Sequence, residues 1–458
     1  MRILILGAGQ VGSSAAYHLS REESNEVTVV DVRPEVLREL QDRLDIRTVV
    51  GHAAYPDVLD RAGAADADIV VALTDSDETN MVACQVAYTL FNTPTKIARI
   101  RASDYMTADE LFTPESIPID VRISPEQLVC EYVEQLILYP GASQVLDFAE
   151  GRVRLVGAQA DRDGLLVGQR IATLKQHIPN AEGRIAAIYR EGKAMLPEGD
   201  TVIQEDDEVF FLADRKDIRV FMSEMRRLED PVRRVVIAGG GNIGLRLAHA
   251  LEQTNQVKLI ERDPERARRI SEQLNKAIVL VGDAADEELL LEENIDNVDV
   301  FCALTNSEEA NILSSMLAKR LGAHKVMALI NRASYVDLVE AGSIDIAISP
   351  QQVTIGSLLA HVRRGDVVKV HSLRRGAAEA IEAIAHGNEN DSKVVGRRID
   401  EVSLPKGAAI VTLVRGKEVI FAHHDTVIEA GDHVILFLTD RRKIEDLEKL
   451  FQVGVSFI

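Results

Sequence analysis

The fold of this chain is decided by one stretch near its start, Ile3-Leu4-Ile5-Leu6-Gly7-Ala8-Gly9-Gln10-Val11-Gly12. The apolar run predicts a buried strand, and the glycines fit the tight turn into a helix found in nucleotide-binding folds. A single GxGxxG is weak evidence, because glycines cluster in many loops. The same arrangement recurs at Val235-Val236-Ile237-Ala238-Gly239-Gly240-Gly241-Asn242-Ile243-Gly244. Two copies with matching flanks indicate a duplication.

The duplication extends well beyond the glycines. An acidic residue closes the next apolar run in each half, Asp31 in the first and Glu261 in the second. Two further stretches also recur, Ala72-Leu73-Thr74-Asp75-Ser76 as Ala303-Leu304-Thr305-Asn306-Ser307, and Ile123-Ser124-Pro125 as Ile348-Ser349-Pro350. The chain is therefore predicted to be a tandem duplication.

Short apolar strands alternate with helices in each half. In the first half we expect strands at 2–6, 27–30, 48–50, 69–73 and 96–101, separated by helices at 12–20, 34–44, 57–62 and 78–90. This alternation indicates a parallel sheet covered on both faces. The second half repeats the order from 234 to 330. The predicted fold class is α/β, with two tandem Rossmann-like, doubly wound parallel sheets.

A helix is predicted to follow each sheet. Ser124-Pro125-Glu126-Gln127 and Ser349-Pro350-Gln351-Gln352 both fit a capping box that opens a helix. The first of these helices carries an apolar stripe at helical spacing, which must be buried somewhere. Packing on its own domain and packing on another domain, as a swapped or dimerising helix, both remain open.

Beyond these helices the pattern changes to short strands and turns. The segments 152–214 and 393–440 share this pattern. Within them, Asp200-Thr201-Val202-Ile203 is nearly repeated as Asp425-Thr426-Val427-Ile428. Each half is thus predicted to end in a small β-rich α+β domain. The expected domains are 1–140 and 231–365, which bind nucleotide, and 141–230 and 366–458, which are β-rich.

The composition excludes several classes of protein. A formal net charge of −21 over 458 residues argues against a nucleic-acid binder and against adhesion to anionic lipid. The three cysteines are widely spaced and lack a CxxC pattern, so we expect neither disulfides nor a zinc site, as in a reducing cytosol. With no signal peptide and no run near the ~20 apolar residues of a membrane span, the expectation is a cytoplasmic protein without direct bilayer insertion.

The glycines of each motif have separate predicted roles. Gly7 and Gly239 permit the tight turn, Gly9 and Gly241 let the backbone approach a pyrophosphate, and Gly12 and Gly244 let the helix pack on the sheet. Asp31 and Glu261 lie about 20 residues further on, where a carboxylate accepts hydrogen bonds from an adenosine ribose and favours NAD over NADP. ATP and ADP carry the same ribose hydroxyls, so both ligand classes remain open. The alternative is a degenerate fold that keeps its glycines for packing alone.

Further candidate contacts follow the later strands. Thr74 and Asp75 come after the fourth strand, at the edge where ligands bind in such sheets. Asp75 and Glu78 also fit a helix N-cap and its N3 partner, as do Asn306 and Glu309, so capping and ligand contact are both open.

Arg99 ends the fifth strand and is suited to contact a phosphate. The second half has Ala328-Leu329-Ile330 in that region, so the two sites are expected to differ in affinity or ligand. Arg101 and Arg332 do repeat, and either a salt bridge within the fold or a functional role would explain them.

An enzyme is the alternative reading. A soluble NAD-dependent oxidoreductase would need substrate-positioning and proton-transfer residues facing the nicotinamide. The β-rich segments offer no repeated His, Lys or Tyr constellation. We therefore expect no catalytic residue, and the sequence shows no metal-binding cluster.

With its doubled GxGxxG, its two ribose-type carboxylates and its paired β-rich domains, the chain resembles the TrkA family of Trk-type potassium-uptake regulators over essentially its whole length. The modules of that family are of the RCK type. The resemblance implies a homotetramer, an eight-module ring docked peripherally on an integral-membrane K⁺-translocating subunit at the cytoplasmic face of the bacterial inner membrane. It also implies that NAD(H) or ATP/ADP shifts the conformation of the ring and so alters K⁺ flux.

The resemblance also assigns candidate cofactor-binding positions. In the first half these are Gly7, Ala8, Gly9, Gln10, Val11, Asp31, Thr74, Asp75 and Arg99, and in the second half Gly239, Gly240, Gly241, Asn242, Ile243 and Glu261. The packing glycines Gly12 and Gly244 complete the two candidate sites.

Overall fold

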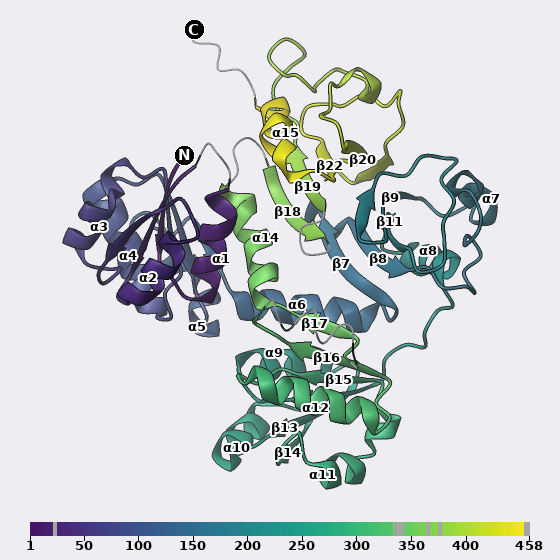
Figure 1. The fold of residues 1–458 in the computed structure, drawn as a ribbon, viewed down its shortest axis with the longest axis horizontal. Coiled ribbons are helices and arrows are strands. Elements are labelled where there is room, and N and C mark those ends of the chain that lie inside the picture. Colours follow the sequence, from purple (N-terminus) through teal and green to yellow (C-terminus); the bar gives the residue numbers. More distant parts are fainter. Residues whose placement is uncertain are drawn as a thin grey trace. The chain divides into compact units, whose positions relative to one another are not determined.

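The computed structural model describes residues 1–21, 25–332, 335, 342, 344–362, 367–373 and 378–452. Within these residues the chain forms two six-stranded and two five-stranded sheets, drawn as arrows in Figure 1. The boundary expected between residues 365 and 366 and the C-terminal residues 453–458 lie outside the described ranges.

The first sheet is parallel and has the strand order β3-β2-β1-β4-β5-β6. Strand order reverses between β1 and β4, which is where ligands bind in doubly wound folds. The strands and their covering helices are β1 (Arg2–Leu6), α1 (Gln10–Leu19), β2 (Glu26–Asp31), α2 (Pro34–Gln41), β3 (Arg47–Val50), α3 (Pro56–Ala62), β4 (Ile69–Ala72), α4 (Asp77–Phe91), β5 (Thr95–Arg99), α5 (Ser103–Met106) and β6 (Val121–Ile123).

The second large sheet repeats this topology as β14-β13-β12-β15-β16-β17. Its elements are β12 (Arg234–Ala238), α9 (Asn242–Leu251), β13 (Gln256–Glu261), α10 (Pro264–Gln273), β14 (Ile278–Val281), α11 (Glu287–Glu292), β15 (Val300–Ala303), α12 (Glu308–Arg320), β16 (Lys325–Leu329) and β17 (Ile346–Ile348). The predicted pair of doubly wound parallel sheets is therefore confirmed. The edge strands β6 and β17 were not predicted, because three residues are too few to carry a periodic pattern.

Each half then continues into a five-stranded antiparallel sheet. The first has the order β10-β9-β11-β8-β7 and the second the same order, β21-β20-β22-β19-β18. The elements are β7 (Ala142–Phe148), β8 (Val153–Gln159), α7 (Leu174–His177), β9 (Gly183–Arg190), β10 (Lys193–Met195), β11 (Glu208–Asp214), α8 (Ile218–Met225), β18 (Val367–Leu373), β19 (Ala378–Ile384), β20 (Ala408–Arg415), β21 (Glu418–Phe421), β22 (His433–Leu438) and α15 (Ile444–Phe451). The β-rich character predicted for both segments is confirmed.

An ion pair with a buried carboxylate recurs in the two small sheets. Asp207 is 1% exposed and accepts from Arg190 Nε and Nη2, both at 2.7 Å, while the Gln204 N–H donates to it at 2.8 Å. Asp432 is fully buried and accepts from Arg415 in the same bidentate way, with both distances 2.8 Å. Each carboxylate thus ties the end of one strand to the turn before the central strand.

The two small sheets share one hydrophobic core. Phe148, Leu155 and Phe210 of the first pack in the same buried cluster as Val411 and Phe437 of the second. At the edge of this core, the backbone N–H of Ala149 donates to Glu382 Oε2 at 2.9 Å and Lys369 Nζ donates to the carbonyl of Asp147 at 2.9 Å. Burial of these apolar faces against each other stabilises the two small domains as a pair.

The helices that follow the large sheets are α6 (Pro125–Leu138) and α14 (Pro350–Val362). The chain divides into two compact units, and residues 348–358, which include most of α14, belong with Met1–Val129 rather than with the second sheet. In that unit α14 lies beside α1, and Ser14 Oγ is 3.1 Å from Gln351 Oε1 (Figure 1). Helix α6 in turn belongs to the other unit from Cys130 onward. Most of α14 is thus associated with a large domain other than its own, within a single chain. The surface that buries the apolar stripe of α6 stays a prediction.

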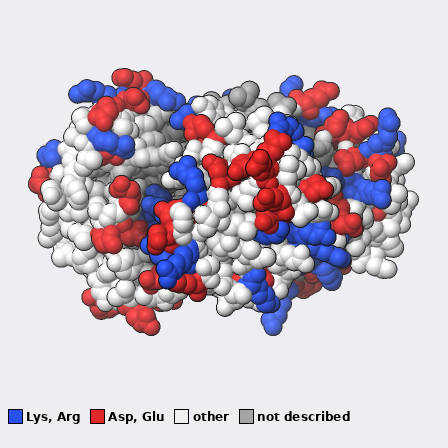
Figure 2. All heavy atoms as spheres, turned by 90° about the horizontal axis from the view of Figure 1, so that it is seen from below, with Lys and Arg blue, Asp and Glu red and all other residues white. Residues whose placement is uncertain are grey.

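Acidic and basic side chains are interspersed on the face drawn in Figure 2, although the chain is strongly acidic overall. No helix in the described part of the chain is long and apolar enough to cross a bilayer. Within the same ranges, no cluster of three or more His, Cys, Asp or Glu residues is placed to hold a metal ion, and all three cysteines are buried and free.

Candidate nucleotide-binding sites

The first glycine loop has the geometry that its sequence pattern requires. Gly7 has a φ of +103°, and a Cβ atom there would lie 2.9 Å from the carbonyl oxygen of Leu73. A Cβ on Gly12 would lie only 1.9 Å from the carbonyl oxygen of Gly7. A Cβ on Gly9, by contrast, would meet no atom within 4 Å. Two glycines are thus needed for packing, and the middle one borders open space.

The second loop repeats these relationships. Gly239 has a φ of +106°, a Cβ on Gly244 would lie 1.9 Å from the Gly239 carbonyl oxygen, and Gly241 again has nothing within 4 Å. One difference is Gly240, where a Cβ would lie 2.3 Å from Ile270 Cδ1, whereas the first loop carries Ala8 at this position.

Helices α1 and α9 begin directly after these loops. Gly9 and Gly241 are their N-cap residues, and neither helix start receives a side-chain cap. The first residues of the helices, Gln10 and Asn242, are exposed. A helix N-terminus presents backbone N–H groups without intrahelical partners, together with the positive end of the helix dipole. Both loops can therefore receive an anionic group such as a pyrophosphate.

The two acidic residues at the ends of β2 and β13 bond to the glycine loops. Asp31 Oδ2 accepts from the backbone N–H of Ala8 at 2.7 Å, and Glu261 Oε2 accepts from Gly240 at 2.9 Å. Burial favours a higher pKa for Asp31, but hydrogen bonds from the Arg33 side chain and from the Ala8 and Arg33 backbone outweigh it and lower that pKa. Asp31 is therefore a carboxylate at neutral pH, held at the mouth of the loop.

The surroundings of the two carboxylates differ. The Arg33 guanidinium donates to Asp31 Oδ1 through Nε at 3.1 Å. In the second half Glu261 Oε1 accepts from the backbone of Asp263 at 3.0 Å, and the side chain of Asp263 caps α10 instead. A cation is thus paired with the first carboxylate, and an acidic side chain stands at the equivalent position in the second site.

A buried asparagine organises the loop after β4 and has its counterpart after β15. Asn80 Oδ1 accepts from the Thr74 backbone N–H at 2.9 Å, while Asn80 Nδ2 donates to the carbonyl of Arg99 at 2.9 Å. Asn311 makes the same pair of contacts with Thr305 and with the carbonyl of Leu329, both at 2.9 Å. Sequence reasoning assigned these asparagines no role. Their recurrence at the same spacing in both halves was the available signal.

The helix caps in these loops differ from those expected. Ser76 Oγ accepts from the Thr79 backbone at 3.1 Å and Ser307 Oγ from the Ala310 backbone at 3.2 Å, so the N-caps are the serines. Capping, one of the two alternatives left open for Asp75 and Asn306, is therefore not their role, since each cap lies one residue later. Ser76 has the extended backbone conformation of an N-cap, which leaves Asp75 outside the helix and exposed.

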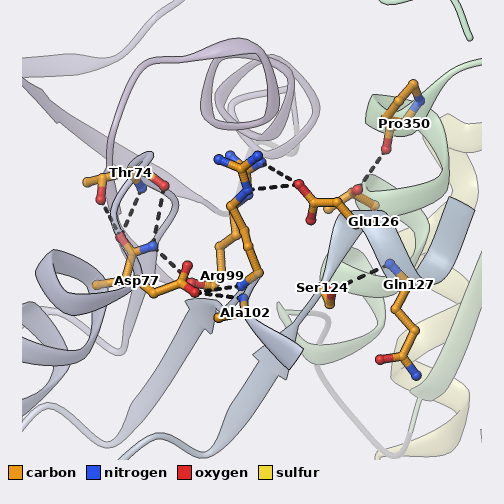
Figure 3. Close-up of polar contacts among 11 residues, drawn as sticks. Thr74, Asp77, Arg99, Ala102, Ser124, Glu126, Gln127 and Pro350 are labelled. Carbon is orange, nitrogen blue, oxygen red and sulfur yellow. Dashed lines mark hydrogen bonds and ion pairs between the residues drawn. The ribbon is translucent and has the colours of Figure 1, made fainter. Parts of the chain in front are cut away.

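Arg99 lies at the carboxyl end of β5, where it was expected, but its side chain is engaged. Its Nη2 is 3.3 Å from Glu126 Oε1, and Arg101 Nε donates to the same oxygen at 2.9 Å (Figure 3). The salt bridge considered for Arg101 is therefore present. Asp77, the first residue of α4, accepts from the backbone N–H groups of Arg101 and Ala102, both at 2.9 Å.

Comparison with protein families identifies the chain. A model described as the TrkA-N domain matches residues 3–125 and 235–350, and one described as the TrkA-C domain matches 156–226 and 389–452. Trk system potassium uptake protein TrkA of Halomonas elongata is 61% identical over 457 residues, with both chains fully covered. The chain belongs to the TrkA family. The TrkA proteins of Vibrio alginolyticus and Haemophilus influenzae, 57% and 51% identical, also match over their whole length.

Solved structures agree with this TrkA fold. The crystal structure of the GsuK RCK domain has a TM-score of 0.62 at 18% identity and covers 98% of this chain and 94% of its own. The GsuK channel bound to NAD has a TM-score of 0.61 at 18% identity, covering 98% and 78%. At 18% identity, this structural similarity shows that the chain shares the RCK fold.

Proposed function

We propose that this TrkA-family chain is a nucleotide-binding regulatory component of a Trk-type potassium uptake system, and not an enzyme. The observation that carries the proposal is the repeated contact between a strand-end carboxylate and the glycine loop, Asp31 with Ala8 and Glu261 with Gly240. It supports two ligand sites of one chemical class in one chain. The division into domains 1–140, 141–230, 231–365 and 366–458 is part of the same proposal.

The ligand class that suits these residues is NAD(H) or the adenine nucleotides ATP and ADP. The open sides of Gly9 and Gly241 and the uncapped starts of α1 and α9 suit a pyrophosphate, and the two carboxylates suit ribose hydroxyls. The GsuK channel, which shares the fold, is described as bound to NAD. Thr74, Asp75 and Arg99 would lie toward the distal end of a nucleotide in the first site. A bound nucleotide supplies binding energy that differs between two conformations, and no bond needs to be broken.

The proposed partner is the integral-membrane K⁺-translocating subunit of the system, contacted at the cytoplasmic face of the bacterial inner membrane. Full-length identity of 51–61% to Trk system potassium uptake proteins supports this assignment. Four chains with two RCK modules each would form an eight-module ring, in which several sites act on one equilibrium. Nucleotide binding would then change the conformation of the ring and alter K⁺ flux.

The first test is affinity purification of the tagged chain from detergent-solubilised membranes. The expected result is a stoichiometric polytopic cation transporter that comes with the chain. Recovery without any membrane protein, together with unchanged K⁺ uptake in cells lacking the chain, would refute the regulatory role.

A second test separates a regulator from a soluble NAD-dependent oxidoreductase. Calorimetric titration of the purified chain with NADH and with ATP should show binding, while the absorbance of NADH stays constant over time. Steady conversion of NAD to NADH in a screen of small reduced metabolites would favour the enzyme instead.

A further inference from the structure

The carboxylate of Glu126 is shared between two arginines at the edge of the first sheet. Its Oε1 lies 3.3 Å from Arg99 Nη2 and 2.9 Å from Arg101 Nε, as drawn in Figure 3. The Glu126 residue is only 7% exposed, and the Arg99 side chain is 18% exposed. A single, largely buried acceptor atom therefore holds two cations, of which Arg99 is mostly buried and Arg101 is 38% exposed.

The same cluster contains buried polar atoms that are not hydrogen-bonded. Within the part of the chain that the structure describes, Glu126 Oε2, Arg99 Nε and Asp77 Oδ1 have no hydrogen-bond partner. A buried charged group that leaves part of its hydrogen-bonding capacity unused is costly. Arg99 and Glu126 thus retain donor and acceptor capacity for a further group, which a fully satisfied structural ion pair would lack.

The second half provides a comparison within the same chain. Leu329 stands at the position of Arg99, since each ends its strand and gives its carbonyl to the repeated asparagine, and Gln351 stands at the position of Glu126. A cation and an anion have been replaced together, which keeps the local charge balanced. Arg101 and Asp77, by contrast, keep their charge as Arg332 and Glu308. Arg99 and Glu126 therefore act as a matched pair that is special to the first site.

Glu126 connects this ion pair to helix α6, which continues into the other compact unit. Glu126 lies in the first turn of α6, which begins at Pro125, and α6 belongs to the other compact unit from Cys130 onward. Arg99 closes β5, and its carbonyl is connected through Asn80 to Thr74. Thr74 N would lie 3.0 Å from a Cβ placed on Gly7. The ion pair thus ties the start of α6 to the loops that surround the first candidate site.

We propose that Arg99, Arg101 and Glu126 form a latch on α6 that the phosphates of a bound nucleotide open. The latch rests on the proposed nucleotide-binding function of the first site. A phosphate group binds arginine through charge-assisted hydrogen bonds and competes with Glu126 for both guanidinium groups. A ligand can shift an equilibrium only by its different affinity for two states, and here the state with Glu126 released binds phosphate better.

The latch predicts a different result for each of two variants. Glu126→Gln removes the competing charge and should increase the affinity of the first site for ATP on the order of tenfold, a typical size for coupling between sites. The double variant Arg99→Leu/Glu126→Gln reproduces the residues of the second half, which the native chain already tolerates. It should fold normally but lose the response of α6 to nucleotide.

The experiment is hydrogen exchange of the full chain, following peptides that cover the start of α6, with ATP as probe and adenosine as the phosphate-free control. In the wild type, ATP should speed exchange at the start of α6 and adenosine should not. Glu126→Gln should show fast exchange without ligand, and the double variant should show no ATP-dependent change.

Each alternative outcome has a separate meaning. If ATP binds the wild type but exchange in α6 is unchanged, or if Glu126→Gln binds ATP no more tightly, the latch is refuted while the proposed function stands. If the wild type binds neither ATP nor NADH in calorimetric titrations, the proposed function fails and the latch fails with it.

Discussion

A Cβ atom on Gly12 would lie 1.9 Å from the carbonyl oxygen of Gly7, so the turn between β1 and α1 closes only around glycine. We predict that Gly12→Ala forces the helix away from the sheet and destabilises the first large domain by about 3 kcal/mol. Loss of the corresponding urea-unfolding transition, or a clear drop in its midpoint, would show this. An unchanged midpoint would mean that the loop relaxes at no cost.

Gly9→Ala is the matched control, because a methyl group there meets no atom within 4 Å. Gly9 has φ −69° and ψ −171°, which alanine adopts without strain. Stability should change by no more than about 0.5 kcal/mol. Nucleotide affinity, measured by calorimetry, should nevertheless fall, because the methyl group occupies the space through which a pyrophosphate approaches. Wild-type affinity in this variant would place the ligand elsewhere.

The carboxylates of Asp31 and Glu261 should control the two sites independently. Asp31→Ala removes the acceptor for the ribose hydroxyls in the first site, and Glu261→Ala removes it in the second. Each loss should weaken binding at its own site on the order of tenfold, since hydrogen bonds to charged groups are worth about 1.5–3 kcal/mol. Calorimetric titration with NADH should show one weakened class of sites in each single variant and two in the double variant. Titration curves identical to wild type would make Asp31 a purely structural residue.

The buried carboxylate of Asp432 and its partner Arg415 should stabilise the second small domain. Asp432→Asn removes the buried charge that accepts both guanidinium donors, while Arg415 keeps its exposed partner Glu429. We expect a loss of about 2 kcal/mol. Glu205→Gln is the control, since Glu205 and Arg162 form a surface pair with side chains 53% and 85% exposed. Thermal unfolding should separate the two variants, and equal melting temperatures would argue against the predicted contribution of Asp432.

A pH dependence is expected from Glu252. Its carboxylate accepts from the backbone N–H groups of Lys276, Asn275 and Ala277, with Lys276 contributing most, and its pKa falls to about 2 from the usual 4.5. A pKa that is lower in the folded state stabilises the protein above the unfolded pKa, and this stabilisation is lost as the pH falls toward the folded value. Glu252→Gln should therefore cost about 2 kcal/mol at neutral pH. The difference from wild type should shrink as the pH is lowered below 4.5. A difference that does not vary with pH would exclude this carboxylate as its source.

The boundaries of the elements show which structural features a local sequence pattern can predict. Strands β1 and β4 were predicted to within a residue, because each is a continuous apolar run between polar or glycine residues. The sequence offered Asp75 as a possible cap of α4, whereas the cap is Ser76, because both side chains can cap a helix and only the backbone conformation distinguishes them. Edge strands such as β6 carry too few residues to be recognised before their partner strand is known.

The sequence by itself determined the duplication, the doubly wound sheets and the packing roles of the first and last glycine in each loop. These depend on residue type at fixed local spacing, and the chain shows each pattern twice. The tertiary structure alone decided where α14 packs and which partner Arg99 takes. An apolar stripe specifies that a helix is buried but not against which surface, and a charged side chain does not specify which of several opposite charges will reach it. The pairing of Ser14 with Gln351, and of Arg99 with Glu126, arises only when distant segments meet.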